Sequence, residues 1–202
     1  MEIICLDLEG VLVPEIWIAF AEKTGIEALK ITTREEPDYH KLMNYRMDIL
    51  REKGLTLKDI QDVIATIKPL EGAKEFLESL RSMTQVVILS DTFSEFAKPL
   101  MKQLGWPTIL CNSLVVDEND MLTGISMRQE DGKRKAIEGF RSMGFRTFAA
   151  GDSYNDLTMI RKADKGCLFR APKNILEEEP DLALCTTYDE FLAEIKKFVE
   201  EK

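Results

Sequence analysis

Four short polar segments of this chain carry residue types that could act together on a phosphate group. They are residues 7–11 (Asp-Leu-Glu-Gly-Val), Ser90 with Asp91, Lys133, and residues 151–156 (Gly-Asp-Ser-Tyr-Asn-Asp). A carboxylate, a hydroxyl, a cation and a second group of acids are what phosphate chemistry with a divalent metal requires. The four segments in this order are far more specific than any one of them.

Three of the four segments follow apolar runs, which predict strands that would bring these segments together. Residues 3–6, 86–89 and 148–150 are short apolar stretches that end in polar or glycine residues. Such runs are typical of strands buried on both faces of a parallel sheet. Ligands of open α/β sheets bind at the carboxyl ends of the strands, so we expect the four segments to meet at one edge.

Helix and strand patterns alternate after residue 68. This alternation predicts an α/β fold with a doubly wound, Rossmann-like parallel sheet. The expected helices span residues 72–81, 94–104, 133–143, 155–162 and 188–199, and the expected strands span residues 86–89, 109–111, 147–150, 167–169 and 182–185.

Two regions depart from this alternation. Residues 14–68 show no convincing strand, whereas residues 16–23, 41–52 and 57–67 have helical periodicity, which predicts a small helical cap inserted directly after the first strand. Residues 114–116 and 122–126 flank a polar turn and predict a β-hairpin. The expected division is therefore a core of residues 1–13 and 69–202 and a cap of residues 14–68.

Composition limits the classes of partner and compartment. The 202 residues are 45% hydrophobic and carry a net charge of −9, which argues against a nucleic-acid partner because phosphate contacts need clustered Lys and Arg. No signal peptide or membrane-spanning run is recognisable, and the four cysteines lack metal-type spacing. We expect a cytoplasmic enzyme for a small molecule, without membrane contact, as a monomer or small homo-oligomer. His40 is the single histidine, which excludes a multi-histidine metal site.

The first segment offers a nucleophile and a proton donor. Asp7 could attack phosphorus if a metal and a cation neutralise the repulsion between two anions. Glu9 lies two residues later, so its side chain can return to the same side of an extended segment and exchange protons with the leaving oxygen and with water. The alternative is that both acids merely begin a turn before Gly10.

The second and third segments could grip the phosphate. Ser90 can donate a hydrogen bond to a phosphoryl oxygen, although a plain helix N-cap is the more common role of such a serine. Lys133 can supply a positive charge at the start of a helix. Because Arg134 and Lys135 are its neighbours, a solvated basic cluster is the competing interpretation.

The fourth segment could hold the metal. Asp152 and Asp156 flank Asn155 in a loop that glycine opens, and carboxylate oxygens suit Mg²⁺. A capped turn without a metal is the alternative for this loop.

With these residues in this order, the chain resembles the haloacid dehalogenase-like phosphatases over nearly its full length. It is most similar to the phosphoserine phosphatases, in particular to their bifunctional branch, which also transfers phosphate to homoserine. The residues that carry the resemblance are Asp7, Glu9, Ser90, Lys133, Asp152, Asn155 and Asp156. Residues 69–73 (Pro-Leu-Glu-Gly-Ala) and 122–124 (Leu-Thr-Gly) also look like that family.

The resemblance implies a set of roles. Mg²⁺ would be held by the Asp7 side chain, the Glu9 main-chain oxygen and Asp152, with Asp156 outside the direct shell. The phosphate would be bound by Ser90, Asp91 through its backbone, Lys133 and Asn155. In the cap, Glu15 would pair with the ammonium of phosphoserine, and Arg46 would hold its carboxylate. The implied activities are phosphoserine hydrolysis through an aspartyl phosphate and transfer to homoserine.

Three positions depart from the family pattern. Glu9 replaces the usual Asp and is longer by one methylene, and Val11 stands where a hydroxyl residue is usual. Asp91 replaces the usual glycine, so its side chain narrows the space near the substrate. For the third segment Lys135 competes with Lys133, and we favour Lys133 because Ile137 then follows one helical turn later.

Two other functions fit part of the pattern. A response-regulator receiver also uses carboxylates, a hydroxyl residue, a lysine and Mg²⁺ at strand ends, but Glu9, the late Asp152 loop and the long cap count against it. A capped phosphatase for another metabolite, such as a sugar phosphate, is the second alternative, and Glu15 and Arg46 count against that one.

Overall fold

The computed structural model describes residues 1–32, 35–36 and 38–201. Within these residues, seven strands form one sheet in the order β4-β3-β2-β1-β5-β6-β7. The strands are β1 Glu2–Leu6, β2 Gln85–Phe93, β3 Ile109–Val116, β4 Leu122–Ser126, β5 Arg146–Gly151, β6 Lys165–Phe169 and β7 Ala183–Cys185. Every neighbouring pair is parallel except β3 and β4, which form the antiparallel hairpin. The predicted doubly wound α/β fold is confirmed.

Strand β1 lies at the point where the strand order reverses, between β2 and β5. Its side chains alternate between two buried layers, because Ile4 and Leu6 pack into one apolar cluster and Ile3 and Cys5 into the other. Burial on both faces explains why the strand reads as an unbroken apolar run.

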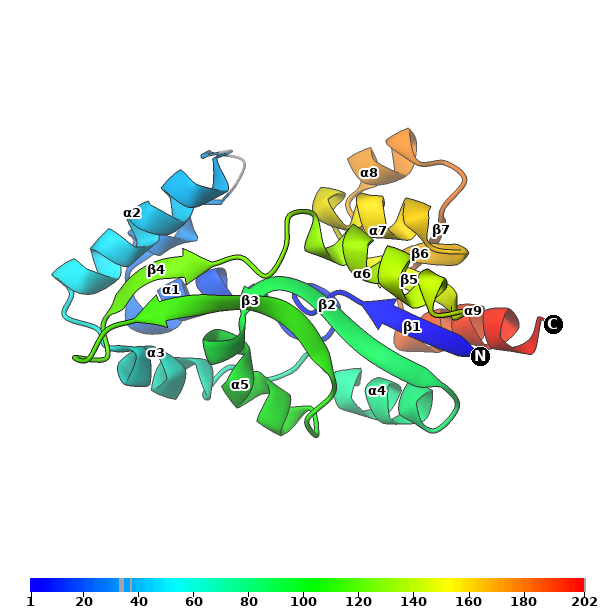
Figure 1. Ribbon diagram of the computed structural model, residues 1–202, viewed down its shortest axis with the longest axis horizontal. Coiled ribbons are helices and arrows are strands. Elements are labelled where there is room, and N and C mark those ends of the chain that lie inside the picture. Colours follow the sequence, from blue (N-terminus) through cyan, green and yellow to red (C-terminus); the bar gives the residue numbers. More distant parts are fainter. Residues whose placement is uncertain (33–34, 37, 202) are drawn as a thin grey trace.

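Helices cover both faces of the sheet (Figure 1). One face carries α4 Ala73–Arg81, α5 Ser94–Gln103 and α9 Tyr188–Glu200, and the other carries α6 Gly132–Ser142, α7 Leu157–Lys162 and α8 Lys173–Glu178. Stacked rings fill the layer under α4 and α9, where Phe76 and Phe169 each lie within 5.0 Å of Phe191 between ring centroids. The helices packed on both faces hold the strands in place, and with them the carboxyl edge of the sheet.

The helices after β1 lie beside the β3–β4 hairpin (Figure 1). They are α1 Ile16–Thr24, the 3₁₀ turn η1 Glu27–Lys30, α2 Tyr39–Glu52 and α3 Leu57–Ile64. Helix α2 packs against β4, and the backbone N–H groups of Leu57 and Lys58 donate to the main-chain and side-chain oxygens of Asp120 at 2.7 and 2.8 Å. The hairpin turn thus caps α3. The division into a core and a cap at residues 14 and 68 stays a prediction.

Several element limits differ from the sequence expectation. Helix α3 ends at Ile64 rather than at residue 67, and η1 and α8 were not expected. Strand β3 runs unbroken from Ile109 to Val116, where a strand and a separate hairpin arm were expected. Asn112, a polar residue within this apolar run, is buried, but its hydrogen-bonding groups have partners. Its Nδ2 donates to the main-chain oxygen of Asp91, and its Oδ1 accepts from the main-chain N–H of Arg128, each at 3.0 Å. Among the described helices none has the length and apolar character needed to span a membrane.

Candidate active site

The four polar segments meet at the carboxyl edge of the three central strands. Asp7 follows β1, Ser90 and Asp91 lie in the second half of β2, and the loop of residues 152–156 follows β5. Lys133 is in the first turn of α6, which packs against β2 and β5. The topology therefore brings together residues that are up to 149 positions apart in the sequence.

Lys133 is the centre of the cluster. Its Nζ lies 2.6 Å from Asp156 Oδ1, 2.9 Å from Asp7 Oδ1 and 3.6 Å from Asp91 Oδ2, and its side chain is 4% exposed. Burial alone would lower the pKa of Lys133, but the three carboxylates raise it well above its usual range. Lys135, the rival candidate, is exposed. A permanent positive charge is thus held beside Asp7.

Asp7 is buried, and its N–H donates to the Ala150 oxygen at 2.9 Å, which extends the β1–β5 ladder by one residue. Burial and the neighbouring Asp156 raise the pKa of Asp7 well above its usual range, against the opposing effect of Lys133. A carboxylate that is poorly solvated and next to other acids is one that a cation would stabilise strongly.

Asp7, Asp152 and Asp156 form a group of carboxylates that could hold a metal, with one oxygen of each within 4.8 Å of the others. Asp156 already has partners, since its Oδ1 faces Lys133 and its Oδ2 accepts from the N–H groups of Asp152 and Ser153, both at 3.1 Å. Asp152 has the freer carboxylate, and burial and Asp156 raise its pKa to about 7. Hard, acidic oxygen donors of this kind fit Mg²⁺.

Two glycines leave room for these acids. A Cβ on Gly10 would lie 2.3 Å from Asp152 Oδ2, and Gly10 also has a φ of +74°, which disfavours other residues. A Cβ on Gly151 would lie 2.1 Å from Asp156 Cγ. The glycines of the first and fourth segments therefore let carboxylates approach the backbone, and a side chain at either position would displace them.

Glu9 lies in the segment between β1 and α1. Its Oε1 accepts the N–H of Ile16 at 2.6 Å, so the carboxylate satisfies a donor at the start of α1. Burial and the neighbouring Glu15 raise the pKa of Glu9 to about 7. The Glu9 side chain is not one of the three carboxylates, Asp7, Asp152 and Asp156, that could hold a metal. Its predicted metal contact is through the main-chain oxygen and stays a prediction.

Ser90 and Asn155 are the two uncharged side chains predicted to bind the phosphate. Ser90 is buried, and its Oγ accepts the N–H of Thr92 at 3.2 Å, so its hydroxyl proton is available to another acceptor. Asn155 is exposed, and its Nδ2 donates to Asp91 Oδ2 at 2.9 Å. Both side chains therefore carry hydrogen-bond donors that an anion could accept.

Arg46, from α2, is a buried arginine with 6% exposure. Its guanidinium carbon is 4.5 Å from the centre of the Trp17 ring, and its Nη2 donates to the Ile31 oxygen at 2.6 Å. Its Nε is a buried donor without a hydrogen-bond partner among the described residues. Such a donor is costly unless a ligand satisfies it.

Glu15, the residue before α1, is near enough to Arg46 and Lys133 for each charge to lower its pKa, although burial raises that pKa overall. The acid and the arginine predicted to bind the substrate thus lie in the same electrostatic environment as Lys133.

Two aromatic residues of this site, Tyr39 and Trp17, were not predicted from the sequence. The Tyr39 hydroxyl donates to the Asp91 oxygen at 3.3 Å and links the cap to β2, and Trp17 supports Arg46. Tyr39 and Arg46 are seven residues apart, which is two helical turns, so both are on one face of α2. That spacing could have indicated Tyr39.

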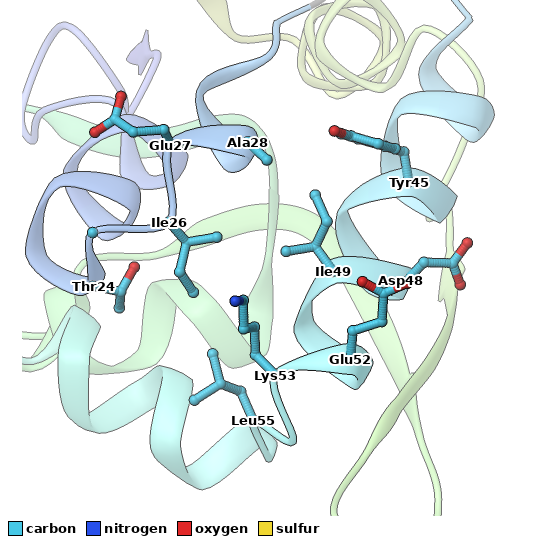
Figure 2. A pocket seen from close by; sticks show the side chains of 11 residues that line it. Thr24, Ile26, Glu27, Ala28, Tyr45, Asp48, Ile49, Glu52, Lys53 and Leu55 are labelled. Atoms are coloured by element: carbon cyan, nitrogen blue, oxygen red, sulfur yellow. The ribbon is translucent and has the colours of Figure 1, made fainter.

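A separate pocket lies away from this cluster. A pocket of about 970 Å³ lies in the cap between the end of α1 and the second half of α2, where Ile26 faces Ile49 and Leu55 (Figure 2). No residue predicted for the site lines it. This pocket is not the candidate active site, because Lys133, Asp7, Asp152 and Asp156 do not line it.

Comparisons with known proteins found similar chains and a similar fold. A family model of haloacid dehalogenase-like hydrolases matches residues 1–164. A Pseudomonas aeruginosa protein named phosphoserine phosphatase ThrH is 59% identical over 197 residues, which covers 98% of this chain and 96% of that protein. A phosphoserine phosphatase of Pseudomonas syringae pv. tomato is 58% identical and covers 98% of this chain and 83% of its own length. A solved phospho-aspartyl intermediate analogue of phosphoserine phosphatase has the same fold, with a TM-score of 0.77, 23% identity, and coverage of 98% of this chain and 99% of the other.

Proposed function

Because this chain belongs to the haloacid dehalogenase-like hydrolase family, we propose that it is a Mg²⁺-dependent phosphoserine phosphatase that forms an aspartyl phosphate on Asp7. The observation that carries the proposal is the contact of buried Lys133 with Asp7 at 2.9 Å, at the strand edge that Arg46 and Glu15 of the cap adjoin. The names of the two Pseudomonas relatives support the same substrate.

The metal would be held by the Asp7 side chain, the Glu9 main-chain oxygen and Asp152. The three-carboxylate group supports this assignment, and the engaged oxygens of Asp156 support its place outside the direct shell. When bound, Mg²⁺ would supply positive charge that polarises the phosphoryl group and lowers the repulsion between two anions.

The protein groups divide the remaining work. Asp7 attacks phosphorus while Lys133, Ser90 and Asn155 donate to the phosphoryl oxygens, whose charge is spread over three positions in the transition state. Glu9 protonates the serine oxygen as it leaves and then takes a proton from the water that hydrolyses the aspartyl phosphate. The cap excludes bulk water during the attack.

Recognition of the amino acid would come from the cap. The Nε–H of Arg46, which is unpaired among the described residues, could donate to a carboxylate oxygen of the substrate. Glu15 would supply a negative charge for the ammonium of the substrate. A sugar phosphate has neither of these groups, which favours an amino-acid substrate.

Arg46→Ala should lower kcat/KM for phosphoserine, because a buried carboxylate would lose its partner. The expected loss of transition-state stabilisation is about 2–5 kcal/mol. Phosphoethanolamine lacks that carboxylate, so its weaker turnover should change little. Steady-state kinetics on both substrates measure the difference. Arg51→Ala, which removes an exposed arginine from the same helix, is the matched control. Equal losses on both substrates would mean that Arg46 only supports the cap.

We also propose that the aspartyl phosphate can pass its phosphoryl group to homoserine. Homoserine has the same ammonium and carboxylate as serine, so Glu15 and Arg46 could hold it after serine leaves. The name ThrH of the 59%-identical relative is consistent with this activity.

A cytoplasmic location agrees with the four free cysteines, and a monomer or small homo-oligomer remains the expected state.

Phosphate release from a panel of phosphorylated metabolites, with Mg²⁺ and with or without homoserine, tests the proposed function. Phosphoserine should be the preferred donor, and label from phosphoserine should appear in homoserine at the expense of free phosphate. A preference for a sugar phosphate would overturn the substrate assignment. Normal hydrolysis without labelled phosphohomoserine would leave a simple phosphatase.

A further inference from the structure

Asp91 places a carboxylate directly between the two side chains that are proposed to grip the phosphate. Its Oδ2 accepts a hydrogen bond from Asn155 Nδ2 at 2.9 Å and lies 3.6 Å from Lys133 Nζ. One oxygen atom therefore contacts a neutral donor and a cation at the same time, which is also how a phosphoryl oxygen would use them.

We propose that Asp91 is an internal substitute for the phosphate: its carboxylate occupies Lys133 and Asn155 when the site is empty and releases them when a phosphoryl group binds. This inference rests on the proposed function, because it takes the phosphate to lie against Lys133 and Asn155. A carboxylate and a phosphate in the same position would repel each other, so the two cannot hold both donors together.

The surroundings of Asp91 allow its side chain to move while its backbone stays in place. The main-chain oxygen of Asp91 accepts from Asn112 Nδ2 at 3.0 Å and from the Tyr39 hydroxyl at 3.3 Å. The Asp91 side chain is 45% exposed, so rotation would transfer the carboxylate into water at little cost. Rotations of exposed side chains take picoseconds to nanoseconds and would not limit turnover.

Lys133 does not need Asp91 to stay charged or in position. It keeps the 2.9 Å contact with Asp7 and the 2.6 Å contact with Asp156 when the Asp91 carboxylate leaves. Of the three contacts of Lys133, the one with Asp91 is the longest, and Asp91 is the most exposed of the three acids. Asp91 is therefore the acid that a ligand can displace.

Displacement has a cost that acts on every phosphate ligand. If the carboxylate holds the donors for about nine-tenths of the time, the apparent affinity for phosphate falls about ten-fold. Phosphoserine can offset that cost through the Arg46 and Glu15 contacts, whereas inorganic phosphate cannot. The expected consequence is fast release of the product phosphate and weak product inhibition.

The test is calorimetric titration of inorganic phosphate into the full chain in Mg²⁺ buffer. Asp91→Ala removes the carboxylate, and Asp91→Asn keeps its size but removes the charge. We expect Asp91→Ala to bind phosphate about ten-fold more tightly than the unchanged protein, which corresponds to about 1.4 kcal/mol. Asp91→Asn should lie between the two. Glu200→Gln removes one exposed charge from the last residue of α9 and should leave the affinity unchanged.

The outcomes separate this inference from the proposed function. Unchanged or weaker phosphate binding by both folded Asp91 variants would overturn the substitute role. If those variants lost affinity for phosphoserine but not for inorganic phosphate, Asp91 would instead contact the amino-acid part of the substrate. Failure of the unchanged protein to hydrolyse phosphoserine would overturn the proposed function, while tighter phosphate binding by Asp91→Ala would still show that the carboxylate competes with anions.

Discussion

Asp7→Asn is expected to lower kcat for phosphoserine by at least about 10³-fold, which is the range seen when a group that stabilises a transition state is removed. A neutral amide cannot form the acyl phosphate. The substitution also removes the negative partner of Lys133 at 2.9 Å, but Lys133 keeps Asp156 at 2.6 Å, so the cluster retains a charged pair. The variant should fold, and its thermal unfolding can be followed to confirm this.

The sharpest measurement for Asp7 is the covalent intermediate itself. Phosphoserine labelled in its phosphate should leave label on the unchanged protein after rapid acid quenching, and mass spectrometry should place it on Asp7. Asp7→Asn should carry no label. Asp62→Asn, on the exposed side of α3, is the matched control and should behave like the unchanged protein. Normal turnover of phosphoserine by purified Asp7→Asn protein would show that Asp7 is not the nucleophile.

The strands and helices that carry the site could be predicted because each has a strong local pattern. Asp7 and Asp152 each follow a strand that is apolar on both faces, and such runs are visible in the sequence. The choice of Lys133 over Lys135 had a local reason as well. Ala136 and Ile137 form the buried face of α6, and Lys133 lies one turn before them on that face. The family resemblance is confirmed by the model match over residues 1–164.

The contacts that the sequence could not predict all join distant segments. Asp91 and Asn155 are 64 residues apart, and Tyr39 and Asp91 are 52 apart. Spacing within one segment indicates which face a side chain shares, but not which side chain approaches from another strand. The same limit applies to Gly10, whose lack of a side chain is explained only by Asp152, which follows a different strand.

The length of β2 shows a second limit. The apolar run ends at Leu89, yet the strand continues through Ser90 and Asp91 to Phe93. The Asp91 oxygen is satisfied by the side chains of Asn112 and Tyr39, so the polar residues need no turn at this point. Ser90 consequently lies in a strand and does not cap a helix.

The second large effect is expected at Glu9. Glu9→Gln should lower kcat by roughly 10²–10⁴-fold, the usual contribution of general acid–base catalysis. The amide oxygen of Gln can still accept the N–H of Ile16, which Glu9 Oε1 accepts at 2.6 Å, so α1 should keep its start. Mg²⁺ affinity should also persist, because the predicted contact is through the main-chain oxygen. Lost Mg²⁺ affinity with normal kcat at saturating metal would contradict the acid role.

A substrate with a good leaving group separates the two proton transfers assigned to Glu9. p-Nitrophenolate needs little protonation to leave, so Glu9→Gln should form the aspartyl phosphate from p-nitrophenyl phosphate at nearly the normal rate. The next step needs a proton taken from water and should remain slow. Stopped-flow absorbance should then show a burst of one p-nitrophenolate per enzyme, followed by slow turnover. Equal slowing of the burst and of the later phase would mean that Glu9 positions the phosphoryl group and does not transfer the proton.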